Sequence, residues 1–148
     1  MHTPGHTEES TTYLLDNTAA LTGDTLFLNG VGRPDLEGGK RQELASRARL
    51  LQMSVSRLLQ LPDAAQVLPG HLSEPILFDG RALTTTVGTI RDTVALAKLD
   101  SAAFVEAVLA QLPPSPPNHS RIVELNERGE IPGDPSELEA GANRCAVV

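Results

Sequence analysis

The segment HTPGHT, residues 2–7, places two histidines in a turn that is rich in glycine and proline. Two later segments have the same character: GDTLF at residues 23–27 places an aspartate in a turn, and PGH at residues 69–71 places a histidine in one. Glycine and proline favour tight turns, which hold a side chain firmly and leave one side of it open to solvent. Neutral imidazole and carboxylate are the ligands expected for zinc, iron or manganese. Together, the three segments predict a metal site.

Around these segments, the apolar residues follow an alternating pattern of short strands and amphipathic helices, which predicts an α/β fold. We expect strands at residues 12–15, 25–28 and 65–68, and helices at residues 42–61, 87–98, 101–112 and 121–128. The longest helix carries Leu51, Val55 and Leu58 on one face, and Pro62 ends it. Ser101 is the expected N-cap of the third helix.

The composition narrows the classes of function. The 148 residues are enough for about one domain, and 12 Lys and Arg against 19 Asp and Glu give a net charge of −7. This acidic balance argues against a nucleic-acid partner, which requires a basic surface. No apolar run approaches the roughly 18 residues of a membrane helix, and no signal peptide is visible. We therefore expect no membrane partner. The single cysteine, Cys145, cannot form an internal disulfide, which favours a cytoplasmic location.

In their order and spacing, the three segments resemble the C-terminal half of metallo-β-lactamase-fold proteins. The loop GVGRPDL at residues 30–36 resembles that of persulfide (sulfur) dioxygenases and their rhodanese-fused relatives, and the resemblance extends from His2 to about Gly129. It implies the second half of the αβ/βα sandwich, with C-terminal helices. Residues 1–112 would form the C-terminal part of that domain, residues 113–130 a proline-rich spacer and its terminal helix, and residues 131–148 a mobile tail.

The resemblance also implies roles for individual residues. His6 would be a metal ligand, and Asp24 would be the carboxylate ligand, either bridging two metals in a hydrolase or bound to one iron in a dioxygenase. His71 would bind the second metal in a hydrolase and only approach the site in a dioxygenase. Arg33 and Asp35 would pair in the loop, either near the mouth of the substrate site or simply as an ion pair that stabilises the loop.

Two activities follow from the resemblance. The first is a glutathione-persulfide dioxygenase, in which one Fe(II) activates O₂ beside the sulfur of a glutathione-type thiol substrate. The alternative is a thioester hydrolase of the glyoxalase II type with one or two Zn(II) ions, in which a metal-bound hydroxide attacks the carbonyl.

The first metal motif of the superfamily, His-x-His-x-Asp-His, is missing from the sequence. A metal needs about three protein ligands, so metal binding by this chain alone is expected to be incomplete. Half of a sandwich would also expose an apolar sheet face to water. We therefore expect a truncated product, a misplaced start site or one part of a split protein. Such a chain could be inactive alone, and its partner would be a separate N-terminal half or a second copy of itself.

Overall fold

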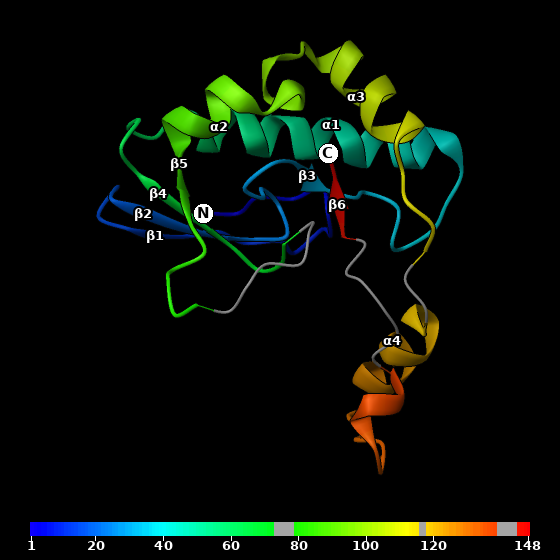
Figure 1. The fold of residues 1–148 in the computed structure, drawn as a ribbon. Coiled ribbons are helices and arrows are strands. Elements are labelled where there is room, and N and C mark those ends of the chain that lie inside the picture. Colours follow the sequence, from blue (N-terminus) through cyan, green and yellow to red (C-terminus); the bar gives the residue numbers. More distant parts are fainter. Residues whose placement is uncertain (73–78, 116–117, 139–144) are drawn as a thin grey trace.

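The protein consists of a helical layer over one face of a small mixed sheet, with helix α4 standing apart from both (Figure 1). The computed structural model describes residues 1–72, 79–115, 118–138 and 145–148. The sheet has the strand order β1-β2-β4-β5, formed by Tyr13–Leu15, Ala19–Gly23, Gln66–Pro69 and Thr85–Thr86. β2 and β4 are parallel, and β1 and β5 pair antiparallel at the two edges. The predicted α/β class is confirmed.

Helix α1 forms the middle of the molecule, between the sheet and the outer helices (Figure 1). The helices are α1 (Arg41–Leu58), α2 (Val87–Thr93), α3 (Ser101–Ala110) and α4 (His119–Arg128), with short 3-10 helices at Ala95–Lys98 and Pro135–Leu138. The predicted helix at residues 42–61 corresponds to α1. The predicted helix at residues 87–98 is instead interrupted at Val94, which adopts an extended conformation and separates α2 from a 3-10 turn.

The prediction of a strand at residues 25–28 is wrong. The nearest strand, β2, ends before this segment, at Gly23. Thr25 N donates to Thr22 O, and Phe27 N donates to Gly30 O, so the chain turns twice where an extended strand was expected. Leu26 and Phe27 are nevertheless fully buried. The apolar run therefore reports burial in a loop, which a short pattern does not distinguish from burial in a strand.

The N-cap of α3 also differs from the prediction. Asp100 precedes the helix in an extended conformation, and its carboxylate accepts a hydrogen bond of 2.9 Å from Ala103 N. Ser101 is instead the first helical residue. A carboxylate at this position satisfies a free amide of the first turn and also interacts favourably with the helix dipole.

The core lies between the inner sheet face and α1, and the other sheet face carries exposed apolar side chains. Leu51, Val55 and Leu58 of α1 are buried, as their spacing predicts. On the opposite face of the sheet, Tyr13 is 69% exposed and its cross-strand partner Leu21 is 41% exposed. In the part of the chain that the structure describes, the apolar side chains on this second sheet face are therefore left exposed.

The C-terminal residues return to the domain. β6 (Ala146–Val147) pairs antiparallel with β3 (Val31–Gly32), and Val147 is 1% exposed within the core. The mobility of residues 131–148 stays a prediction, and residues 139–144 lie outside the described residues. Val147, near the C-terminus, is packed in the core. Across the described ranges, no helix is both long and apolar enough to span a bilayer.

Candidate metal centre

Asp24 and His71 meet because they follow two neighbouring parallel strands. β2 ends at Gly23 and β4 ends at Pro69, and these two residues are in register across the sheet. Gly70 N donates to Gly23 O at 2.8 Å, which extends the pairing one residue beyond the strand end. The carboxyl ends of parallel strands share one edge of a sheet, and residues just beyond that edge commonly form binding sites. The turns after β2 and β4 therefore bring a carboxylate and an imidazole together.

His71 and Asp24 are in direct contact. The Nδ1 atom of His71 lies 2.7 Å from Oδ1 and 2.8 Å from Oδ2 of Asp24. An ionised carboxylate can only accept hydrogen bonds, so His71 donates from Nδ1. In the neutral ring, the lone pair is then on Nε2. The His71 side chain is 52% exposed, whereas that of Asp24 is 14% exposed.

His6 approaches the same carboxylate from the N-terminal loop. Its Nε2 atom lies 3.5 Å from Asp24 Oδ2, and the residue is buried. Its Nδ1 atom lies 2.8 Å from the main-chain oxygen of Arg33, to which only a protonated Nδ1 can donate. A carbonyl in this position fixes the ring orientation and leaves Nε2 with the lone pair, as in metal-binding histidines.

The loop that carries His6 is fixed against α1 by close packing and hydrogen bonds. The Ser54 hydroxyl donates a hydrogen bond of 2.7 Å to Pro4 O. Gly5 has a φ of +134°, and a Cβ at this position would overlap the backbone of Leu51. Glycine is required here both by the backbone conformation and by the close approach of the helix.

Two more glycines shape the space around Asp24. A Cβ on Gly70 would lie 2.8 Å from Asp24 Oδ1, and a Cβ on Gly32 would overlap the main-chain oxygen of Asp24. Any side chain at either position would displace the aspartate. The glycines thus allow three loops to converge on one carboxylate.

A residue that the sequence analysis did not assign to the site, Cys145, also lies there. The ligand atoms of Asp24, His71 and Cys145 all lie within 4.8 Å of one another. Arg33 N donates to Cys145 O at 2.9 Å, next to the pairing of β3 with β6. Burial raises the pKa of the Cys145 thiol to about 11, with the negative charge of Asp24 adding to the effect and Arg33 opposing it. No local pattern around Cys145 could have revealed this contact, because it depends on the return of the C-terminus.

The donor set suits a divalent metal ion of borderline softness. Two imidazoles and a thiol surround the Asp24 carboxylate. Imidazole and thiol are typical ligands for zinc, and both also occur with Fe(II) and Co(II). The side chains of His6, Asp24 and His71 thus fit the metal implied by the three turn segments.

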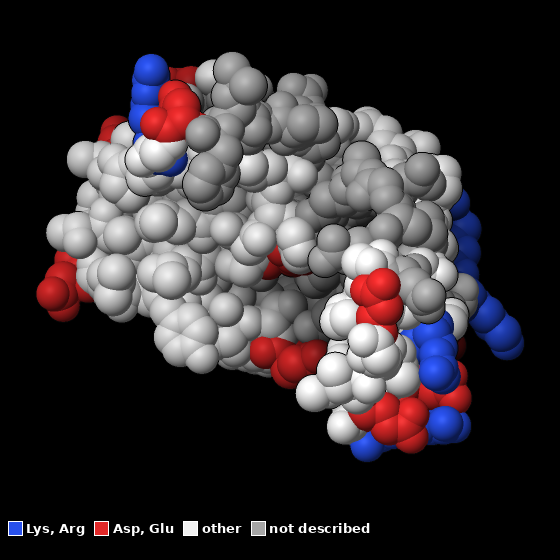
Figure 2. Space-filling view, turned by 60° about the horizontal axis from the view of Figure 1, so that its bottom comes forward, with Lys and Arg blue, Asp and Glu red and all other residues white. Residues whose placement is uncertain are grey.

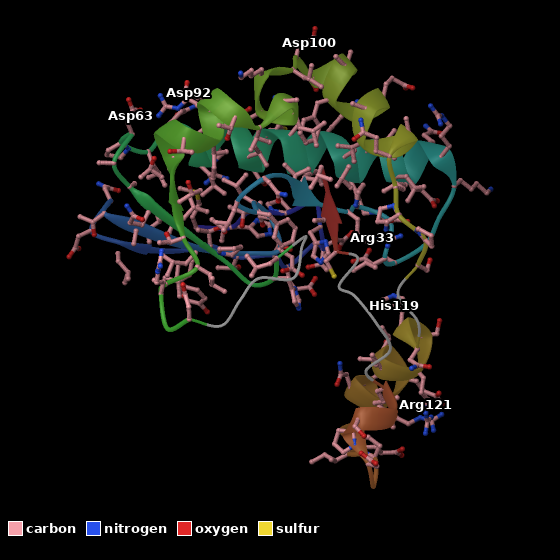
Figure 3. The ribbon with its side chains drawn as sticks, viewed as in Figure 1. Arg33, Asp63, Asp92, Asp100, His119 and Arg121 are labelled. Carbon is pink, nitrogen blue, oxygen red and sulfur yellow. The ribbon has the colours of Figure 1, made fainter. Side chains whose placement is uncertain are left out.

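Arg33 and Asp35 form an ion pair inside the loop. Arg33 Nε donates to Asp35 Oδ1 at 2.7 Å, and Nη2 donates to Oδ2 at 2.8 Å. The guanidinium also donates to the main-chain oxygens of Pro113 and Pro114, at 2.8 and 2.9 Å, and Arg33 is 1% exposed. Figure 3 shows Arg33 beside β6, on the side of the segment that leads to α4. These contacts favour a role in stabilising the loop, and a role toward substrate stays a prediction.

The other two histidines serve the structure. His2 Nε2 lies 2.6 Å from Glu8 O, within the N-terminal loop. His119 Nε2 lies 2.9 Å from Leu36 O and joins the start of α4 to the loop after β3 (Figure 3). A groove of about 660 Å³ runs beside this contact and is lined by Glu9, Glu37 and Glu127. Figure 2 shows acidic and basic side chains interspersed over the surface of α4.

The chain is similar in sequence to curated proteins that carry hydrolase-like or probable metallo-hydrolase names, although no protein-family model matches it. The beta-lactamase hydrolase-like protein of Xylella fastidiosa is 34% identical over 107 residues, covering 71% of this chain and 23% of that protein. A probable metallo-hydrolase of Burkholderia pseudomallei is 34% identical over 108 residues, covering 64% of this chain and 33% of the relative. The chain thus spans about a third or less of the length of these curated relatives.

Two solved structures have the same arrangement over 85% of the chain. One is a metallo-beta-lactamase from Staphylococcus aureus, with a TM-score of 0.68, 27% identity and 38% of its own chain covered. The other is ETHE1 from Myxococcus xanthus, with a TM-score of 0.67, 30% identity and 51% of its own chain covered. The resemblance noted from the three turn segments is therefore confirmed.

Proposed function

Because this chain is a metallo-β-lactamase-fold protein, we propose that His6, Asp24 and His71 hold a divalent metal ion in the active centre of a metal-dependent enzyme. The observation that carries the proposal is the position of Asp24, whose carboxylate lies 3.5 Å from His6 Nε2 and 2.7 Å from His71 Nδ1. His71 Nδ1 donates to Asp24 in the metal-free chain, and a cation bound between them would displace that proton and take the Nδ1 lone pair. With His6 Nε2, the two imidazoles and the carboxylate would then provide a three-ligand site.

Four residues around the proposed metal position have separate tasks. His6 offers Nε2 to the metal, and the Arg33 carbonyl holds the ring in that tautomer through Nδ1. Asp24 supplies the negative charge, and its low exposure limits competition from water. Arg33 acts through its main-chain oxygen, while its guanidinium and Asp35 keep the loop in place. When bound, the metal would supply Lewis-acid or O₂ chemistry.

The parent activity that we favour is oxidation of a glutathione persulfide by O₂ with a single Fe(II). Two observations support it: the resemblance of loop residues 30–36 to persulfide dioxygenases, and the 30% identity to ETHE1 over most of the chain. A glutathione-type thiol is then the substrate. Zinc-dependent hydrolysis of a thioester is the second candidate, because curated relatives carry the name metallo-hydrolase.

Metal content and oxygen uptake test the proposal together. The 148-residue chain is loaded anaerobically with Fe(II) or Zn(II), and bound metal is measured after gel filtration for the native chain and for Asp24→Asn. We expect metal in the native chain and little in the variant. Oxygen uptake with glutathione persulfide by the iron form supports the dioxygenase. Oxygen-independent cleavage of a glutathione thioester by the zinc form supports the hydrolase and eliminates the dioxygenase.

A third outcome assigns the chain a different role. If metal binds but neither substrate is converted, the chain is a metal-binding fragment whose catalysis needs residues from another polypeptide. If Asp24→Asn retains as much metal as the native chain, the assignment of Asp24 as a ligand is wrong.

A further inference from the structure

We propose that the C-terminal segment contributes a metal ligand, and that the Cys145 thiol completes the site with Asp24 and His71. The inference rests on the proposed metal-binding function and adds a sulfur donor to it. The ligand atoms of these three residues lie within 4.8 Å of one another, a spacing that one ion could bridge after small side-chain movements.

The backbone places Cys145 at the site. Arg33 N donates to Cys145 O, and the next two residues pair with β3 as strand β6. Val147 anchors this strand in the core with 1% exposure. The thiol position is therefore set by a strand and a buried side chain that are independent of any metal.

Three separate parts of the fold supply the donors. Asp24 follows β2, His71 follows β4, and Cys145 precedes β6. A carboxylate, an imidazole and a thiol that meet from distant parts of a chain match the ligand chemistry of a tetrahedral Zn(II) or Co(II) site. His6 Nε2, 3.5 Å from Asp24 Oδ2, is a further nitrogen donor beside this group.

Binding at Cys145 requires loss of its proton. To ligate a divalent cation, the Cys145 thiol would release its proton to solvent and bind as the thiolate, with no change of oxidation state. In the metal-free chain the neighbouring carboxylate disfavours the thiolate, whereas a divalent cation at this point would neutralise that carboxylate. With Cys145, the described residues contribute enough donors for this chain to bind metal by itself.

Cobalt spectroscopy tests the proposal, because thiolate-to-cobalt charge transfer gives a strong near-ultraviolet band that oxygen and nitrogen ligands do not. Cys145 is the single cysteine of the chain, so such a band has one possible source. Co(II) is titrated anaerobically into the full chain, into Cys145→Ser and into Asp24→Asn. His119→Ala serves as a matched control, because that histidine contacts Leu36 O away from the site.

We expect the charge-transfer band in the native chain and in His119→Ala. Cys145→Ser should lose the band and bind Co(II) at least tenfold more weakly, with an unchanged circular dichroism spectrum. If the native chain binds Co(II) without the band, and Cys145→Ser binds it equally well, the sulfur ligand is refuted while the metal site stands. If neither the native chain nor Cys145→Ser binds Co(II), the proposed function fails as well.

Discussion

At the scale of single residues, the site is centred on Asp24, because every other candidate donor lies close to this carboxylate. His6 reaches it from a loop pinned to α1, and His71 reaches it from the end of β4. The order of three short turns and the family resemblance that it carries led to the expectation that these residues share a site, and their roles as ligands stay a prediction. Cys145 could not be predicted in this way, because its position depends on the pairing of β6 with β3.

The glycine after β4 offers a sharp test of this geometry. In Gly70→Ala, the new Cβ would lie 2.8 Å from Asp24 Oδ1, so the carboxylate must move. We expect Zn(II) affinity to fall at least tenfold, measured by competition with a chromophoric chelator. Gly133→Ala is the control, since a Cβ there meets no atom within 4 Å. Equal affinities in the two variants would show that the position of Asp24 does not matter for metal binding.

The reactivity of Cys145 in the metal-free chain follows from its pKa. A rise in the thiol pKa from 9.0 to about 11 lowers the thiolate fraction at pH 8 about 100-fold. The greater nucleophilicity of a more basic thiolate recovers about tenfold of this loss. We therefore expect iodoacetamide to react about tenfold more slowly with the folded chain than with the urea-unfolded chain.

The raised pKa of Cys145 also makes the free energy of unfolding depend on pH. Between pH 9 and 11 the folded chain retains a proton that the unfolded chain releases, so the free energy of unfolding falls as pH rises through this range. Below pH 9 both states hold the proton, and this contribution is fully present.

In the iodoacetamide experiment, alkylation of the folded chain at the rate of the unfolded thiol would contradict the burial of Cys145 beside Asp24.

At the scale of elements, the sequence predicts what local periodicity controls and misses what distant contacts control. The 3.6-residue spacing of Leu51, Val55 and Leu58 correctly predicts the buried face of α1. β2 was missed because its residues, AALTG, are small and only weakly alternating. The buried run at Leu26 and Phe27 was read as a strand, although its backbone turns twice. Its burial depends on packing that no short window contains.

Arg33 is the residue that joins elements to one another, and its removal should cost stability. Arg33→Met leaves the Asp35 carboxylate and the Pro113 and Pro114 carbonyls without a buried donor. Breaking a buried ion pair from one side costs about 3 kcal/mol or more. We expect a loss of this size in the free energy of unfolding, measured by urea titration followed by circular dichroism.

A surface ion pair provides the comparison for Arg33. The Arg41 and Glu106 side chains are 72% and 71% exposed, so Arg41→Gln should change stability by less than about 0.5 kcal/mol. Losses of similar size in the two variants would mean that the contacts of Arg33 contribute no more than an exposed pair.

At the scale of the whole molecule, one sheet face carries exposed apolar side chains among the residues that the structure describes. Tyr13, Leu15 and Leu21 are 69%, 55% and 41% exposed on strands β1 and β2. Contiguous exposed apolar surface favours association.

We predict that the isolated chain self-associates through this face at micromolar concentrations. Leu21→Lys places a charge at its centre and should shift the chain toward monomer in sedimentation velocity. Met53→Lys is the control, because Met53 is 59% exposed and belongs to α1, not to the sheet. A native chain that is monomeric at all concentrations would refute the prediction, as would an equal shift in both variants.

A crystal structure of the zinc-soaked chain, with anomalous diffraction recorded at the zinc edge, would locate any metal bound at Asp24. We predict one strong anomalous peak within about 2.0–2.2 Å of a nitrogen of His6 or His71 and of an Asp24 oxygen, the usual zinc–ligand distances. A zinc peak at His2 or His119, with none beside Asp24, would show that His6, Asp24 and His71 do not form a metal site.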